Sequence, residues 1–305
     1  MKYFENYHLP ASVDEALELL AHYDGQARII AGGTDLLLDL ESDYAEGQRH
    51  RYAALIDVTH IAGANEIRHQ DTHIVIGCGV THTQVVESAL VEARGTALAE
   101  ACAVVGGPQV RNVATLVGNV AHALPAADGT IALMALDAEA LVGTRDSVGA
   151  HGGTSIQEWR PLASIFRGPG ESAVDATREL IIAVRFRPAM PGEASAFARI
   201  MRPQGVALPV LGMAARVQLN GDTFESVAIS AGPVAPVPFR AAQTEAFLRG
   251  RTWSHETCAR ATEILLGEAR PRTSPHRATK EYRFELLPVL LEKTVSCAVE
   301  RARYK

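Results

Sequence analysis

The stretch Ile29-Ile30-Ala31-Gly32-Gly33-Thr34-Asp35-Leu36 places two glycines between a short apolar run and the start of a helix. Glycine has no side chain, so this backbone can take positive φ angles and approach a ligand closely. The exposed N–H groups, with the Thr34 hydroxyl beside them, suit a phosphate or pyrophosphate. The segment lacks the Gly-Lys-Ser/Thr of a Walker loop and the G-x-G-x-x-G spacing of a Rossmann unit. A phosphate-binding loop and a tight turn that needs glycine only for its geometry are therefore its two interpretations.

A second segment rich in small residues, TLVGNVAHALPAAD, spans residues 115–128. Its small side chains would let the backbone pass along a flat ligand, while Thr115, Asn119, His122 and Asp128 carry hydrogen-bonding groups. We expect an irregular loop over residues 113–128, because neither a strand nor a helix period is present, and such a stretch inside a domain is typical of a binding site. Its backbone amides need partners, which a ligand would supply. A packing loop between two lobes is the alternative interpretation.

Short strands and helices alternate around these two segments. Ser12 and Glu15 have the spacing of a capping box at the start of a helix predicted over residues 13–23. Further strands are predicted at 28–30, 53–58, 74–77 and 136–142, and helices at 35–40, from Thr81 or Thr83 to 90, and at 95–105. This alternation indicates an α/β or α+β arrangement rather than a sandwich or a helical bundle.

The pattern changes beyond a predicted linker at residues 188–192. A strand is predicted before the linker at 179–186, strands follow it at 194–201, 209–219 and 224–231, and helices are predicted at 238–249, 254–267 and 280–305. Asn220-Gly221, between the last two strands, is a strong hairpin signal. Three strands followed by helices indicate an α+β domain whose helices cover one face of an antiparallel sheet.

The composition is that of a globular chain with a large core. The 305 residues are 47% apolar, and 29 Lys and Arg against 35 Asp and Glu give a formal charge of −6. At roughly 150 residues per domain, this length predicts about two domains. The pI near 6.0 and the lack of a basic stripe argue against a nucleic-acid partner. No apolar run approaches the ~18 residues of a membrane span and no signal peptide is recognisable, so we expect no membrane insertion and a cytoplasmic location.

Four dispersed cysteines, Cys78, Cys102, Cys258 and Cys297, form no C-x-x-C pair. A zinc ribbon or a self-contained iron–sulfur cluster needs grouped ligands, so neither is expected and no metal site is predicted. Buried, reduced thiols are expected instead. The Gly-x-Ser-x-Gly motif is absent, no nucleophile triad can be assembled, and no catalytic residue is predicted.

Taken together, these segments resemble the FAD-binding medium subunit of molybdenum hydroxylases, the family of xanthine dehydrogenase and carbon monoxide dehydrogenase. The matching pieces follow in family order: residues 7–12, 31–36, 56–58, 76–82, 109–115, Gly118-Asn119, 125–128, Phe166 and Glu179-Leu180-Ile181. Two positions depart from the family pattern. Val117 stands where the family usually has glycine, and Arg199 where it often has lysine.

The resemblance implies a mixed α+β fold in two domains. The first is a two-lobed FAD-binding domain of the vanillyl-alcohol-oxidase/PCMH type over residues 1–176, with lobes of about 1–57 and 58–176. The second is a smaller α+β domain over residues 177–305, with an antiparallel sheet and a helical extension at its end.

The resemblance also implies FAD as the cofactor of this chain. The two glycine-containing loops would grip its pyrophosphate, Asp128 would hydrogen-bond the cofactor, and Leu180 would lie near its adenine portion. The complete set of expected cofactor-binding residues is Ile30, Ala31, Gly32, Gly33, Thr34, Asp35, Leu36, Thr115, Gly118, Asn119, Ala123, Asp128, Leu180 and Arg199.

In such a family, substrate is oxidised at a molybdopterin cofactor on a large partner subunit, and [2Fe–2S] clusters on a small partner subunit carry the electrons to FAD. This chain would pass them to NAD⁺ or another acceptor, within a dimer of heterotrimers. Two alternatives stay open: a stand-alone FAD-dependent reductase or oxidase of the same fold, and a non-catalytic scaffold subunit. NADPH turnover by the isolated chain would favour the first, and absence of bound flavin the second.

Overall fold

A parallel three-stranded sheet begins the chain in the computed structural model, which describes residues 3–45, 52–145, 155–202, 208–275 and 277–304. Its strands, in spatial order, are β1 (Phe4–His8), β3 (Tyr52–Asp57) and β2 (Ala27–Ile30). Helix α1 (Val13–Tyr23) connects β1 to β2, and the Ser12 hydroxyl caps it by accepting a hydrogen bond from the Glu15 N–H. The helix therefore begins where the capping-box pattern predicts it. Helix α2 (Leu36–Ala45) follows β2 and extends beyond the single turn expected from the sequence.

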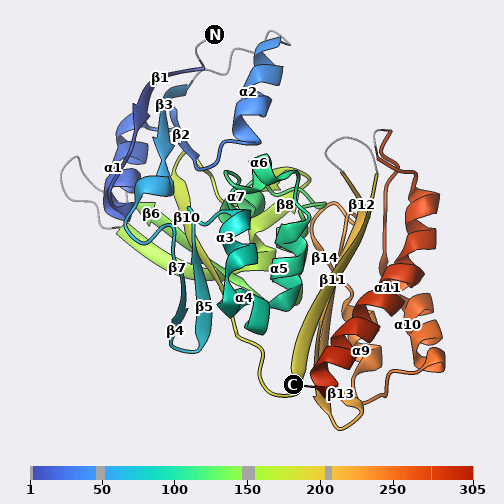
Figure 1. The fold of residues 1–305 in the computed structure, drawn as a ribbon. Helices are drawn as coiled ribbons and strands as arrows, with labels where there is room; N and C mark the ends of the chain where they lie inside the picture. Colours follow the sequence, from blue (N-terminus) through green and yellow to red (C-terminus); the bar gives the residue numbers. More distant parts are fainter. Residues whose placement is uncertain (1–2, 46–51, 146–154, 203–207, 276, 305) are drawn as a thin grey trace.

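The second sheet has five antiparallel strands, with β10 in its centre (Figure 1). The spatial order is β4 (Ile67–Gln70), β5 (His73–Gly77), β10 (Glu179–Phe186), β6 (Glu139–Arg145) and β7 (Ser155–Pro161). A C-terminal domain that starts at residue 177, as expected from the family resemblance, would contain β10. Its pairing with both β5 and β6 corrects this boundary. The chain passes from one half to the other in residues 187–192, which form neither helix nor strand and include the predicted linker.

Short helices connect β5 to β6 and lie against the second sheet (Figure 1). They are α3 (His82–Glu87), α4 (Ala89–Arg94), α5 (Thr96–Ala103), α6 (Pro108–Arg111), α7 (Leu116–Ala121) and α8 (Asp128–Ala135). The prediction of an irregular stretch over residues 113–128 is wrong, because α7 lies inside it and α8 begins at its end. All residues of α8 are buried, so this helix has no polar face whose period would reveal it. The following strand, β6, accordingly starts at Glu139 rather than at residue 136.

The C-terminal half is an antiparallel sheet covered by helices, as the sequence predicts, but the sheet has four strands where three were expected. Its elements are β11 (Glu193–Met201), β12 (Pro209–Asn220), β13 (Thr223–Gly232), β14 (Phe239–Arg240), α9 (Ala242–Leu248), α10 (His255–Glu268) and α11 (Lys280–Arg303). Asn220 pairs with Thr223, so the β12–β13 hairpin turns at the predicted place. The helix predicted over 238–249 begins only at Ala242, because residues 239–240 pair with β13 as an edge strand.

Each half has its own apolar core, and the two halves meet through α5 and α8, which pack against β11 and β12. Ion pairs reinforce this contact: Asp137, after α8, pairs with Arg216 and Arg240, and Glu100 of α5 pairs with Arg301 of α11. Short elements complete the N-terminal half: η1 (Val58–His60), η2 (Leu162–Ile165), and the paired β8 (Phe166–Gly168) and β9 (Glu171–Ser172). No helix within the described ranges is long and apolar enough to cross a membrane.

Candidate functional site

A cavity of about 860 Å³ lies between the β2–α2 loop, α7 and the edge of the C-terminal sheet. This volume lies near the upper end of the roughly 300–1,000 Å³ that small-molecule and cofactor sites occupy. Thirteen of the fourteen predicted residues line it: Ile30, Ala31, Gly32, Gly33, Thr34, Asp35, Leu36, Thr115, Gly118, Asn119, Asp128, Leu180 and Arg199. Ala123 does not line it, because this residue is fully buried and the neighbouring Leu124 faces the cavity instead.

The β2–α2 loop forms one wall of the cavity. A Cβ atom at Gly32 would lie 2.2 Å from the carbonyl oxygen of Val113, so only glycine allows this loop to meet the chain in front of α7. Gly33 has a φ of +68°, which other residues rarely adopt. The glycines are therefore needed for the geometry of a tight turn, and the loop also lines the cavity. The tight-turn and ligand-binding interpretations of this segment are thus compatible.

The start of α7 forms the adjoining part of the same wall. The Thr115 hydroxyl caps the helix by accepting a hydrogen bond of 3.0 Å from the Gly118 N–H. The Asn119 side-chain oxygen accepts one of 3.2 Å from the Thr130 N–H, which ties α7 to α8. Val117, the residue that departs from the family pattern, is almost fully buried and borders the cavity without filling it.

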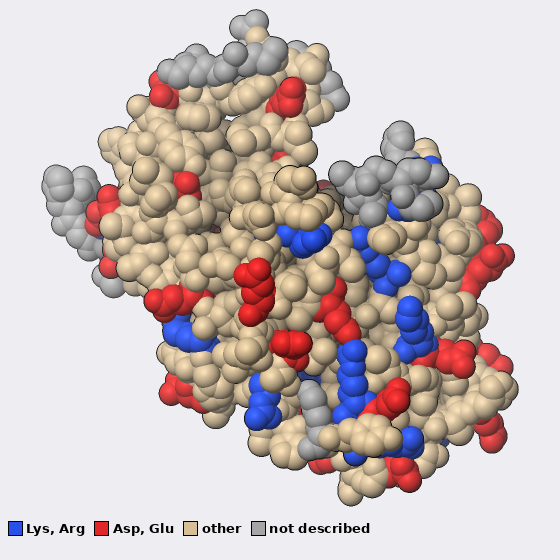
Figure 2. Space-filling model, viewed as in Figure 1, with Lys and Arg blue, Asp and Glu red and all other residues tan. Residues whose placement is uncertain are grey.

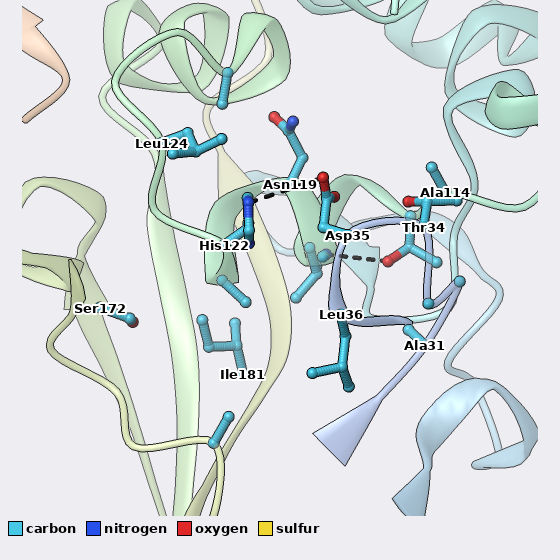
Figure 3. A pocket seen from close by; sticks show the side chains of 18 of the residues that line it. Ala31, Thr34, Asp35, Leu36, Ala114, Asn119, His122, Leu124, Ser172 and Ile181 are labelled. Atoms are coloured by element: carbon cyan, nitrogen blue, oxygen red, sulfur yellow. Dashed lines mark hydrogen bonds and ion pairs between the residues drawn. The ribbon is translucent and has the colours of Figure 1, made fainter. Parts of the chain in front are cut away.

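His122 links the two segments across the cavity. Its Nε2 lies 3.8 Å from Asp35 Oδ1 and its Nδ1 lies 3.9 Å from Asp39 Oδ2. Figure 3 shows the side chains of His122, Asn119 and Asp35 converging from α7 and the glycine loop. Since His122 is partly exposed and both carboxylates are about half exposed, these are solvent-screened contacts.

A buried ion pair closes the end of the cavity near the C-terminal sheet. Arg199 donates from one terminal guanidinium nitrogen to Asp128 Oδ2 at 2.6 Å, and each side chain is 5% exposed. Burial raises the pKa of Asp128 to about 6, although the positive charges of Arg199 and Arg277 oppose this rise. Two further atoms of the pair, Asp128 Oδ1 and Arg199 Nε, are buried without a hydrogen-bond partner in the part of the chain that the structure describes. An acceptor and a donor are thus available to a ligand.

Residues from the C-terminal half that sequence reasoning missed also line this end. Leu208 and Pro209 precede or begin β12, and Arg277 lies just before α11. These residues reach the cavity only through tertiary packing, and no local motif marks them. Glu179 and Ile181, on either side of the predicted Leu180 in β10, also line the cavity.

Two buried thiols and a buried histidine lie at this part of the cavity: Cys78 and His82 line it, and Cys102 lies behind His82. His82 Nδ1 is 3.2 Å from Cys102 Sγ, and burial lowers the pKa of His82 to about 4. Burial likewise raises the pKa of Cys78 to about 12 and that of Cys102 further. All three groups are neutral near pH 7, so the thiols are no nucleophiles. Across the described ranges, no group of three or more His, Cys, Asp or Glu side chains is arranged to hold a metal ion.

Comparison with known families agrees with this arrangement. A family model for the FAD binding domain in molybdopterin dehydrogenase matches residues 2–188, and a model for the CO dehydrogenase flavoprotein C-terminal domain matches residues 195–298. The chain therefore belongs to the FAD-binding flavoproteins of the molybdopterin dehydrogenases. The predicted resemblance, the mixed α+β fold and the FAD cofactor are confirmed.

More specifically, the chain is the FAD subunit of a molybdenum hydroxylase complex. It is 29% identical to the xanthine dehydrogenase FAD-binding subunit of Escherichia coli O157:H7, covering 98% of this chain and 97% of the relative. It is 25% identical to the carbon monoxide dehydrogenase medium chain of Hydrogenophaga pseudoflava, covering 97% of each chain. A solved structure of carbon monoxide dehydrogenase from that organism superimposes with a TM-score of 0.85, 25% identity and 99% coverage of each chain.

Proposed function

We propose that this chain collects single electrons from [2Fe–2S] clusters on a small partner subunit and passes them in pairs to NAD⁺ or another acceptor. The observation that carries the proposal is the cavity itself. It is large enough for a dinucleotide, it is lined by two small-residue segments, and it ends at a buried Asp128–Arg199 pair with an unused acceptor and an unused donor.

The residues present fit FAD at each part of the cavity. Backbone N–H groups of residues 32–36 and of Val117 would hold the diphosphate, since helix starts favour negative charge, whereas the N–H groups of Gly118 and Asn119 donate to Thr115. Asp128 Oδ1 would accept from, and Arg199 Nε would donate to, polar atoms of a ring system. Leu180 of β10 lines the cavity from the N-terminal half, and the adenine portion would bind near it. When bound, FAD supplies the redox chemistry, because a flavin can take electrons singly and release two together.

The protein's own contribution is binding and electrostatics rather than acid–base catalysis. The cysteines nearest the cavity, Cys78 and Cys102, stay protonated, and His82 stays neutral near pH 7. Preorganised N–H groups and the charged end of the cavity stabilise negative charge without a proton transfer from a side chain. No residue of this chain needs to contact the substrate of the complex.

The relatives' names support the proposed division of labour. One is a medium chain and another an FAD-binding subunit, which implies further subunits beside this one. We place the molybdopterin cofactor on a large partner and the [2Fe–2S] clusters on a small one, in a dimer of heterotrimers. Residues that select the substrate would lie on the large partner. Similarity to these relatives therefore does not assign xanthine or carbon monoxide as the substrate of this complex.

The state of the cysteines favours a reducing compartment. Cys78, Cys102, Cys258 and Cys297 are all free in the structure. Proteins of oxidising compartments commonly carry disulfides, whereas cytoplasmic proteins keep their thiols reduced. We therefore propose that the complex works in the cytoplasm.

The decisive experiment is a UV–visible spectrum of the chain purified gently from its native cells with all bound subunits. Flavin bands together with broad iron–sulfur absorbance, both bleached by substrate of the complex and restored by an acceptor, are the expected result. Flavin without iron–sulfur absorbance, combined with NADPH turnover, would instead support a stand-alone flavoenzyme. A complex without flavin would overturn the proposal.

A further inference from the structure

Arg277 brings a guanidinium group to the Asp128 end of the cavity. The residue lies in the turn before α11 and is half-buried, and its backbone N–H donates to the Ser274 carbonyl oxygen. Within the described ranges, its side chain has no hydrogen bond or ion pair. Burial and the charge of Arg272 lower the pKa of Arg277, while Asp128 opposes the change, which places all three groups within electrostatic reach of one another.

Positive charge is in surplus around this residue. Arg199, Arg272, Arg277 and Arg283 form a group with Asp128. The Asp128 carboxylate acts on Arg199 and Arg277, whereas the charges that act on Arg283 are the positive ones of Arg277 and Arg272. Arg283 is fully buried and donates to backbone carbonyl oxygens, which are neutral. The sequence of residues 203–207, PQGVA, contains no Asp or Glu that could balance the surplus.

An unbalanced cluster beside a ligand cavity favours a ligand that is negatively charged there. The unused acceptor of Asp128 and the unused donor of Arg199 would suit either end of FAD, because adenine and the flavin ring both present a donor next to an acceptor. Charge separates the two possibilities. Adenine stays neutral, whereas two electrons and one proton added to a flavin leave one negative charge on its ring near pH 7.

We propose that Arg277, supported by Arg272 and Arg283, is a positioning residue that stabilises the negative charge of the reduced flavin ring and thereby raises the reduction potential of bound FAD. This inference rests on the proposed function, since it requires FAD in the cavity. It assigns the C-terminal half a role in tuning the cofactor. In Figure 2, Lys and Arg side chains gather on that half beside the hollow between the two halves, in agreement with this role.

The test is the midpoint potential of FAD in the full chain, measured by spectroelectrochemistry for the wild type, Arg277→Gln and Arg277→Lys. Loss of the charge in Arg277→Gln should reduce the equilibrium constant for two-electron reduction about tenfold, which corresponds to a potential about 30 mV lower. Arg277→Lys retains the charge and should stay close to the wild type. The matched control is Arg28→Gln, because Arg28 is also half-buried and lines the cavity, but from β2 of the N-terminal half, where its charge acts on Asp175. Its potential should not change.

FAD affinity, measured by fluorescence titration, separates the failure of this inference from that of the proposed function. A wild-type chain that binds no FAD would overturn both the proposed function and the inference about Arg277. Normal FAD binding with an unchanged potential in Arg277→Gln, or an equal decrease in Arg28→Gln, would overturn the inference alone. If Arg277→Gln does not fold, Arg272→Gln replaces it, because Arg272 is exposed and its loss should lower the potential by a smaller amount. An unchanged potential in that variant would then overturn the inference.

Discussion

The cavity has two walls that are built in different ways. The backbone wall, residues 30–36 and 115–119, presents glycines, small side chains and helix starts. The side-chain wall, Asp128, Arg199, Leu208, Pro209 and Arg277, presents charged and apolar side chains from distant parts of the chain. The backbone wall depends on the lack of bulky side chains, which lets its backbone approach a ligand. The side-chain wall depends on specific contacts between side chains, such as the Asp128–Arg199 pair. Substitutions should therefore damage them by different mechanisms and by different amounts.

The largest effect should come from breaking the ion pair of the side-chain wall. Asp128→Ala leaves the Arg199 guanidinium buried without its carboxylate, which should lower the free energy of unfolding by about 3–5 kcal/mol. Chemical denaturation of the apoprotein measures this. The double variant Asp128→Ala/Arg199→Met removes both charges and should regain most of the loss. A single variant as stable as the wild type would show that this wall does not depend on the pair.

A pH titration probes His82, a buried group that lines the cavity beside the backbone wall. His82 has a pKa of about 4 in the folded chain against an ordinary value of 6.5, so the unfolded chain binds the proton first as the pH falls. Stability that is fully present above pH 6.5 should thus be lost between pH 6.5 and 4, by about 3 kcal/mol in total.

Urea denaturation of the wild type and of His82→Asn across this pH range measures the effect. The asparagine of the variant cannot be protonated in this pH range. The difference in free energy of unfolding between wild type and variant should therefore narrow as the pH falls. A constant gap would mean that His82 is protonated in the folded chain at no cost.

Gly32→Ala should damage the backbone wall by crowding. The added methyl group would lie 2.2 Å from the Val113 carbonyl oxygen, so the loop must shift at a cost of about 1–3 kcal/mol. Because the shift moves N–H groups that line the cavity, FAD should bind at least tenfold more weakly in a fluorescence titration. Gly267→Ala is the control: nothing lies within 4 Å of its added Cβ, and it should be neutral or stabilising. Equal FAD affinity in both variants would contradict the role of the loop.

The smallest effect should come from the contact across the backbone wall. His122→Ala removes partly exposed contacts with the Asp35 and Asp39 carboxylates, and its effect on stability should stay within about 0.5 kcal/mol. The small difference should disappear in high salt, as thermal denaturation at two ionic strengths would show. A decrease of more than about 2 kcal/mol in the free energy of unfolding would indicate that the backbone wall depends on His122 for its structure.

The same division explains what the sequence could predict. Ser12 and Glu15, the two glycines of the loop and Asn220-Gly221 act within a few residues, so the helix, the close approach and the hairpin were all predictable. Helix α8 was not, because a helix buried on every side shows no period. Arg277 and the place of β10 were also missed, since each depends on partners that are distant in the chain.

The site residues followed the same rule. The segments in the backbone wall were found from their composition, and Arg199 was found only through the family resemblance. Its pairing with Asp128, 71 residues away, has no local signature. Ala123 was included because it lies within the right segment, but a local pattern cannot tell which side of a turn faces the cavity.

The central position of β10 has a consequence for how the protein is made. Until residue 186 leaves the ribosome, β4–β5 and β6–β7 exist only as separate two-stranded hairpins, which have little stability in water. Joining them requires one strand to enter between two others that precede it by about a hundred and by about forty residues, and such non-local pairing is slow. The nascent N-terminal half therefore keeps its apolar faces exposed for most of its synthesis, and cofactor loading must wait for the strand that completes the sheet.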